Sequence, residues 1–99
     1  MITDATVLAT LISPNGEVDS IILPEDDESR LRQLHGIVGG YIEAVSLPGE
    51  RCMVINENGN DGPHMINHTA TAIAHEAEAI MASDYIAGVA VIFPQEVLQ

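Results

Sequence analysis

The chain has no lysine and no tryptophan, and its three arginines are its only strong cations. Fifteen Asp and Glu residues oppose them, so the formal net charge of the 99 residues is −12 at pH 7. Proteins that bind a nucleic-acid backbone or an anionic lipid surface use Lys and Arg, which displace counterions. The composition therefore excludes direct nucleic-acid binding and attachment to an anionic membrane, and it favours a partner with a basic face.

Aromatic residues and cysteine are also scarce. Phe93, Tyr41 and Tyr85 are the only aromatic residues, so aliphatic side chains and alanine must supply most of one modest core. Cys52 is the only cysteine, which excludes an internal disulfide and indicates a reducing compartment. Because Cys52 lies in an apolar run, we expect an inert core thiol, and the alternative is a reactive or dimer-bridging thiol.

Long apolar runs are absent as well. The longest, over residues 85–93, is far shorter than the ~20 residues of a membrane-spanning helix. Asp4 lies where a secretory signal would carry its basic start, so no signal peptide is predicted. We expect a soluble, cytoplasmic protein that does not contact a membrane.

The first half of the chain alternates short apolar segments with turn-forming residues. Segments 6–12 and 18–23 are rich in β-branched residues and leucine, and Pro14 and Gly16 between them predict a β-hairpin. A helix is predicted after the acidic run over residues 25–28. Its apolar residues recur at helical spacing, and Gly39 and Gly40 are expected to end it.

The second half predicts another hairpin, a helix and a strand. The hairpin covers segments 41–47 and 52–56, and Asn67 is expected to cap an amphipathic helix from His68 to about Ala82. Residues 86–93 are expected to form a central strand that is covered on both faces. The order is thus ββαββαβ in one α+β domain over residues 1–99, with a mostly antiparallel sheet packed by two helices. The core is expected over residues 6–93, with a frayed tail over residues 94–99.

The acidic run over residues 25–28 has two interpretations. Carboxylates in a first helical turn stabilise the positive end of the helix dipole by ~0.3–1 kcal/mol each, which makes the run a solvated helix start. Alternatively, it forms part of a contact surface for a basic partner, or imitates spaced phosphates and blocks a DNA-binding enzyme. The candidate partner-binding residues are Glu17, Asp19, Glu25, Asp26, Asp27 and Glu28.

Residues 56–62 form a polar, glycine-containing loop with asparagines at alternate positions. An EF-hand calcium loop starting at Asn56 would need Gly and a bidentate Glu where this chain has Asp61 and Asn67. A turn is therefore the simpler interpretation, and the alternative is a loop that binds a small polar ligand against the following helix. The candidate ligand-binding residues are Asn56, Asn58, Asn60, Asp61 and Asn67.

Catalytic and metal-binding patterns are missing. His64, His68 and His75 could share one helical face only if the helix began before Pro63, and no HExxH motif is present. No serine lies in a GxSxG context, and Cys52 has no pattern-matched histidine. We expect no metal and no cofactor. A metal-dependent enzyme built on the three histidines is the third and least favoured hypothesis.

A longer pattern extends through the second half of the chain. Its residues are Val38, Gly39, Gly40, Tyr41, Ile42, Glu43, Asn56, Glu57, Gly59, Asn67, Ala70, Thr71, Ile86 and Gly88. Over roughly residues 31–93 the chain resembles the family of small proteins catalogued as domain of unknown function 3846, whose members are common in actinobacteria and in their phages and plasmids. The resemblance implies an accessory protein of a phage or mobile element, and it implies no activity, substrate or catalytic residue.

The leading hypothesis is therefore a non-enzymatic, acidic accessory protein that binds a host protein with a basic face. The alternative is a module that sequesters a small ligand between the loop over residues 56–62 and the helix that follows it. A homodimer through an exposed strand edge or through the alanine-rich helix is compatible with either hypothesis.

Overall fold

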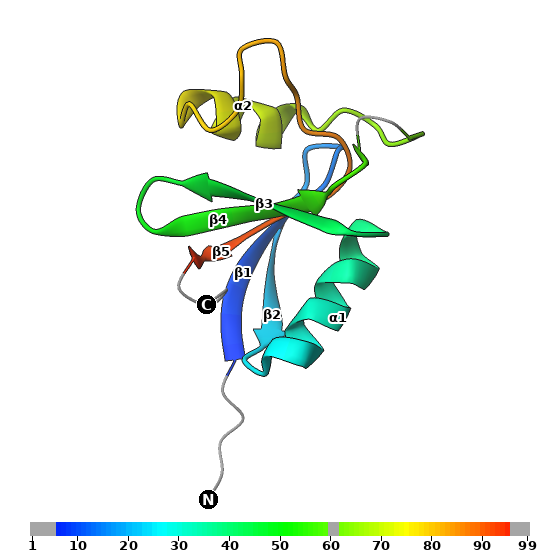
Figure 1. The fold of residues 1–99 in the computed structure, drawn as a ribbon, viewed down its shortest axis with the longest axis vertical. Helices are drawn as coiled ribbons and strands as arrows, with labels where there is room; N and C mark the ends of the chain where they lie inside the picture. Colours follow the sequence, from blue (N-terminus) through cyan, green and yellow to red (C-terminus); the bar gives the residue numbers. More distant parts are fainter. Residues whose placement is uncertain (1–5, 60–61, 96–99) are drawn as a thin grey trace, which may run out of the picture.

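The computed structural model describes residues 6–59 and 62–95 (Figure 1). Its elements are β1 (Thr6–Ile12), β2 (Val18–Pro24), α1 (Asp27–Val38), β3 (Ile42–Leu47), β4 (Arg51–Asn56), α2 (His68–Glu76) and β5 (Ala90–Pro94). The order is ββαββαβ, so the predicted α+β class and element order are confirmed. Of the tail predicted over residues 94–99, Pro94 belongs to β5, and residues 96–99 lie outside the described part.

The strands form one antiparallel sheet in the order β2-β1-β5-β4-β3. Each hairpin supplies one half of the sheet, and β5 joins them by pairing with β1 on one side and β4 on the other. Residues 90–93 of β5 are all buried, which confirms the prediction of a central strand covered on both faces.

The two helices lie on opposite faces of the twisted sheet (Figure 1). The side chains of β4 show this directly, because successive residues of a strand point to opposite faces. Cys52 and Val54 belong to the cluster that contains Leu34 of α1, whereas Met53 belongs to the cluster that contains Ala74 of α2. The single sheet therefore separates two small aliphatic cores.

Helix α1 begins and ends as the sequence predicts. Asp26 is its N-cap, and the Asp26 side chain accepts a hydrogen bond from the Ser29 N–H at 2.9 Å. Gly39 takes the left-handed conformation, with a φ of 80°, and its N–H donates to the His35 carbonyl. A residue with a side chain is strained at this φ, which explains the glycine after the last turn.

The predicted end of α2 near Ala82 was wrong, since the helix ends at Glu76. Glu78 has a positive φ of 54°, and the N–H groups of Glu78 and Ala79 donate to the carbonyls of His75 and Ala74. These bonds close the helix in a Schellman motif, although residue 78 is not a glycine. Ala79 and Ile80 then pack against the α2 core from the turn, so tertiary packing overrides the helix propensity of the alanine-rich sequence.

The predicted start of the last strand at residue 86 was also wrong, because β5 begins at Ala90. Gly88 has a φ of 83°, which interrupts the extended conformation, and its N–H donates to the Met65 carbonyl. Ala87 instead forms an isolated bridge with Ile66. The apolar residues before β5 are therefore buried against the segment that precedes α2 and not within the sheet.

Candidate functional site

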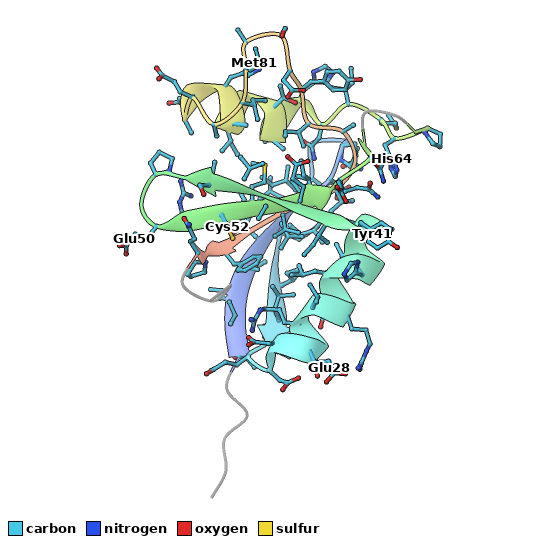
Figure 2. All side chains as sticks on the ribbon, in the orientation of Figure 1. Glu28, Tyr41, Glu50, Cys52, His64 and Met81 are labelled. Atoms are coloured by element: carbon cyan, nitrogen blue, oxygen red, sulfur yellow. The ribbon has the colours of Figure 1, made fainter. Side chains whose placement is uncertain are left out.

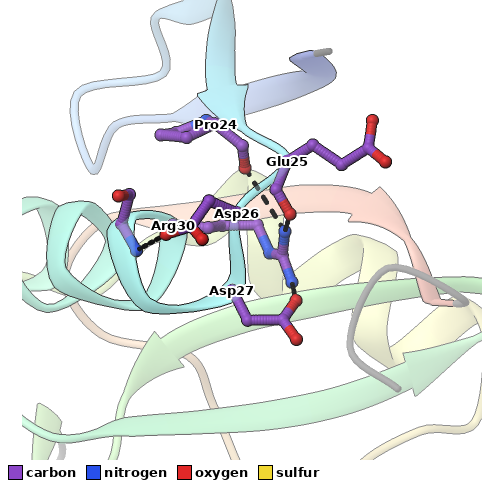
Figure 3. A network of polar contacts seen from close by, with 6 residues as sticks. Pro24, Glu25, Asp26, Asp27 and Arg30 are labelled. Atoms are coloured by element: carbon purple, nitrogen blue, oxygen red, sulfur yellow. Dashed lines mark hydrogen bonds and ion pairs between the residues drawn. The ribbon is translucent and has the colours of Figure 1, made fainter. Parts of the chain in front are cut away.

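The acidic run over residues 25–28 lies at the start of α1, and three of its four carboxylates have local partners. Figure 3 shows the partners of Asp26 and Asp27. Asp26 caps the helix, and its hydrogen bonds from Ser29 hold the pKa of Asp26 below its usual value. Asp27 pairs with Arg30, and Glu28 pairs with Arg32 at 3.3 Å. The geometry is that of a stabilised helix start.

Arg30 is the unexpected residue of this region, because its side chain is only 4% exposed. Its Nη1 donates to the carbonyls of Pro24 at 3.3 Å and Glu25 at 2.6 Å, and its Nη2 donates to Asp27 (Figure 3). The guanidinium thus joins the end of β2 to the first turn of α1. Leu31, one of the apolar residues at helical spacing in this segment, is 45% exposed. An arginine three residues after an aspartate was the only sequence signal for this contact.

The other two residues of the predicted partner surface lie elsewhere. Glu17 follows the turn of the first hairpin, and Asp19 is near the start of β2, whereas Glu25 follows the end of β2. A strand of this length spans about 20 Å. The six predicted residues therefore form two separate groups at the two ends of β2.

Two of the predicted ligand-binding asparagines hold the backbone of the protein itself. The buried Asn56 donates from Nδ2 to the Val38 carbonyl at 3.0 Å, and its Oδ1 accepts from the Asn58 N–H at 2.8 Å. The fully buried Asn67 caps α2, as predicted, and also binds two distant carbonyls. Asn58 is exposed, and Asn60 and Asp61 lie outside the described residues.

The polar loop does line a cavity, on the side of the α1 C-terminus. This cavity of ≈ 280 Å³ is lined by Gly39, Gly40, Tyr41, Asn56, Asn58, Gly62 and His64. Its volume is at or below the lower limit of ordinary small-molecule sites, about 300–1,000 Å³. Only a very small ligand would fit there.

The histidines are dispersed. His64 lies in the loop before α2, His68 is the first residue of α2, and His75 Nε2 is 2.8 Å from the Asp84 carbonyl oxygen. Over residues 6–59 and 62–95, no three His, Cys, Asp or Glu side chains gather in a group that could hold a metal ion.

Cys52 is a buried core thiol, as predicted, and lies within the sheet (Figure 2). Burial raises the pKa of the Cys52 thiol to about 11. A thiol in the unfolded chain has a pKa of about 8.5, so the folded state holds this proton more strongly. The contribution of the thiol to stability is therefore fully present below pH ~8.5 and is lost as the pH rises toward 11.

This pKa shift gives a test. We expect Cys52 to be unreactive toward an aromatic disulfide reagent at pH 8 in the folded protein and to react fully in denaturant. Alkaline destabilisation should be smaller in Cys52→Ala, because this variant lacks the thiol whose pKa is raised in the folded state. Urea unfolding at several pH values measures this difference. Rapid labelling of the folded protein would contradict a buried thiol.

A second cavity lies along the outer edge of β3 and was not predicted. It has a volume of ≈ 660 Å³ and is lined by Glu43, Ala44, Val45, Ser46, Glu78, Ala79, Ile80, Met81 and Asp84. We call it the edge cavity. Glu43 comes from β3, whereas Glu78 and Asp84 come from the turn and the loop after α2. Because the predicted helix extended to about Ala82, Glu78 was expected within it, and the proximity of these carboxylates was not predicted.

The acidic charge of the described chain points outward. Every Asp and Glu in residues 6–59 and 62–95 is exposed, whereas one of the three arginines, Arg30, is buried. Figure 2 shows Glu28 and Glu50 projecting away from the ribbon at different parts of the molecule. The surface is thus even more acidic than the composition indicates.

Comparison with known families identifies the chain. A family model described as domain of unknown function (DUF3846) matches residues 7–96. The chain belongs to this family. No curated protein and no solved structure matches the chain. In the described part of the chain, no helix has the length and apolar character needed to cross a membrane.

Several residues that carry the family resemblance have structural roles. Gly39 ends α1, Asn56 joins the end of β4 to the end of α1, and Asn67 joins three segments. A Cβ at Gly59 would lie 2.8 Å from the Ala87 carbonyl oxygen, so only glycine fits there without a shift. In this chain, these residues of the family pattern stabilise the fold, and their contacts do not indicate a reaction.

Proposed function

We propose that this protein is a non-enzymatic binding protein whose partner is a host protein with a basic face. It acts in the cytoplasm as an accessory protein of a phage or mobile element, the setting that the family resemblance implies. The observation that carries the proposal is the outward display of negative charge. The carboxylates of the described residues are all exposed, while one of the few cations is buried. Such a surface accelerates encounter with basic partners and repels acidic ones.

Two features of the structure support binding over catalysis. Asn56 of the polar loop and Asn67 at the start of α2 both bind backbone groups of the protein itself, and the cavity beside the loop is small. The larger edge cavity is lined by carboxylates and by apolar groups. Carboxylates on an exposed surface select cationic partners without any chemistry at the site.

The test is affinity capture from a host-cell lysate at about 0.05 M and about 0.5 M salt, between which the Debye length falls severalfold. We expect one or more basic proteins to be captured at low salt and released at high salt. A companion variant, Glu17→Gln/Asp19→Asn/Glu25→Gln, removes charge without touching the Asp26 cap or the two arginine pairs. It should reduce capture because it lowers the negative potential.

The salt dependence of capture and the kind of molecule that is bound distinguish the hypotheses. Capture that is equally strong at both salt concentrations would overturn a charge-steered interaction. A stoichiometric small molecule in the native mass spectrum, without a captured protein, would favour the ligand-sequestering alternative. A captured protein with an acidic surface would also contradict the proposal.

A further inference from the structure

The outer edge of β3 has unpaired backbone groups. Tyr41 and Glu57 form a hydrogen-bonded pair just before β3, since the Glu57 N–H donates to the Tyr41 carbonyl at 2.8 Å. The β3–β4 register is regular, so hydrogen-bonded and non-hydrogen-bonded pairs alternate from this point. Ile42, Ala44 and Ser46 therefore direct their N–H and C=O groups away from β4. Among the described residues, no backbone group pairs with them.

The opposite edge of the sheet, β2, is protected in its second half. The same alternation directs the Ile22 and Pro24 carbonyls outward, and α1 covers both of them. Gln33 Nε2 donates to the Ile22 carbonyl at 3.4 Å, and Arg30 Nη1 donates to the Pro24 carbonyl. Pro24 has no N–H to offer to another strand. Val18 and Ser20, in the first half of β2, also direct their backbone groups outward, so β3 is the edge with the longer uncovered run of groups available for pairing.

The edge cavity lies against these unpaired groups. Residues 43–46 all line it, although their side chains alternate between the two faces of the sheet. A cavity lined by four successive strand residues must follow the edge of the strand and not one face. The exposed side chains of Ala44 and Ser46 are small, so another backbone can approach closely. The shape of the cavity fits an extended segment.

The walls of the cavity select the charge of that segment. Glu43 comes from β3, Glu78 from the turn after α2, and Asp84 from the loop that follows, and no cation is among the described lining residues. Ile80 and the exposed Met81 add apolar surface beside them. An extended segment that alternates cationic and apolar side chains would match both kinds of wall.

Backbone strain coincides with this site. Glu78 and Glu50 are the two non-glycine residues of the described chain with a positive φ. Such a conformation lowers the equilibrium constant for folding roughly tenfold. Strained residues of this kind are often found at interaction sites. At the position of Glu78, glycine would relieve the strain, but the carboxylate on the cavity wall would be lost.

A second copy of the chain is a poor occupant. Pairing two β3 edges would bring the carboxylates of both cavities together, between molecules that each carry a formal charge of −12. A cationic partner gains from the same charges that oppose self-association. The negative charge therefore favours a cationic partner over a second copy of the chain.

We propose that the outer edge of β3 binds an extended, Lys- or Arg-rich segment of the partner as an additional antiparallel or parallel strand, with its cations against Glu43, Glu78 and Asp84. This inference rests on the proposed function, and it names the part of the partner that is recognised. Hydrogen bonds to Ile42, Ala44 and Ser46 hold the segment, and the acidic wall sets its charge.

The test uses a fluorescent peptide of alternating Lys and Val, about eight residues long, which is a typical strand length. Binding is measured by fluorescence anisotropy. A second peptide carries N-methyl groups on two adjacent central amides, so both of its edges are blocked while its charge is unchanged. A third replaces Lys with Glu. We expect the methylated peptide to bind about tenfold more weakly, through lost strand hydrogen bonds, and the acidic peptide not to bind.

Two protein variants test the same edge from the other side. Ala44→Pro removes an outward N–H that the sheet does not use, and proline is tolerated at such a position of an edge strand. Ala44→Pro should weaken binding of the Lys/Val peptide about tenfold and leave the melting temperature of the protein nearly unchanged. Ala44→Ser is its matched control. If Ala44→Pro fails to fold, the methylated peptide still decides the question.

The acidic wall is tested with a pair of matched variants. Glu78→Gly and Glu50→Gly each remove one exposed carboxylate and one positive-φ side chain, but only Glu78 lines the cavity. Both should raise the melting temperature, by about 4–8 °C. Only Glu78→Gly should weaken peptide binding, about two- to fivefold, and reduce its salt dependence.

The outcomes separate the inference from the proposed function. If the methylated and unmethylated Lys peptides bind equally, strand pairing at β3 is overturned, while a charge-steered partner stands. If no Lys peptide binds at low salt, the edge inference is overturned, and salt-dependent capture from lysate still decides the proposed function independently. Equal effects of Glu78→Gly and Glu50→Gly on binding would overturn the role of the cavity wall.

Discussion

Replacement of Asn67 by alanine is expected to lower the free energy of unfolding by about 3–5 kcal/mol. The Asn67 side chain is fully buried and makes three hydrogen bonds. Its Nδ2 donates to the carbonyls of Ile12 and Gly88, both at 2.9 Å, and its Oδ1 accepts from the Ala70 N–H at 3.0 Å. Alanine would remove the cap of α2 and the shared donor that joins the carbonyls of Ile12 and Gly88 to it.

The size of this effect is large relative to a total stability of about 5–15 kcal/mol for a small domain. Urea unfolding measures it, and Asn58→Ala is the control, because Asn58 is exposed and should change stability by less than about 0.5 kcal/mol. Asn67→Ser separates the contributions, since serine retains a cap acceptor and cannot reach both carbonyls. A loss no larger than that of an isolated helix cap, about 1 kcal/mol, would contradict the three-way role.

Asn67 illustrates what the sequence could and could not predict. Its capping role follows from local spacing, because Asn is a preferred N-cap and a helical pattern begins directly after it. Its bonds to Ile12 and Gly88 join residues 55 and 21 positions away. No local pattern contains such contacts, because they exist only once β1, β5 and α2 are assembled.

The boundaries of the helices and strands were likewise predictable where nearby residues determine them, and not where tertiary contacts do. The hairpins and α1 were predicted closely, since turn residues, a cap and a left-handed glycine act within a few positions. The end of α2 depends on the packing of Ala79 and Ile80 against the sheet, and the start of β5 depends on the contact of Gly88 with Met65. Propensity favoured a longer helix and a longer strand, and tertiary contacts decided otherwise.

The candidate site depends still more on assembly. The acidic character of the chain was evident from composition, but the run over residues 25–28 serves α1, with its carboxylates engaged by a backbone N–H and two arginines. The edge cavity brings Glu43 of β3 together with Glu78 and Asp84, which follow α2 and lie far from Glu43 along the chain. Their proximity follows from β3 being an edge strand, which the sequence order of the elements does not determine.

Arg30→Ala is the second substitution for which we expect a large effect, a loss of about 2–4 kcal/mol. The guanidinium is buried and bonds the carbonyls of Pro24 and Glu25 as well as Asp27. Hydrogen bonds from a charged donor are stronger than neutral ones, and their removal leaves carbonyls at the β2–α1 junction without this donor. The aliphatic part of the side chain also loses its packing.

Arg32→Ala is the matched control, because Arg32 is exposed and pairs only with an exposed Glu28. It should change stability by less than about 0.5 kcal/mol. Arg30→Lys should fall between the two variants, since an ammonium group keeps the charge but cannot reproduce the forked donor geometry. Urea unfolding gives the stabilities, and amide hydrogen exchange should rise first in α1 of Arg30→Ala, because this side chain anchors the first turn of α1 to β2. Similar losses for Arg30→Ala and Arg32→Ala would show that the buried contacts contribute no more than a surface ion pair.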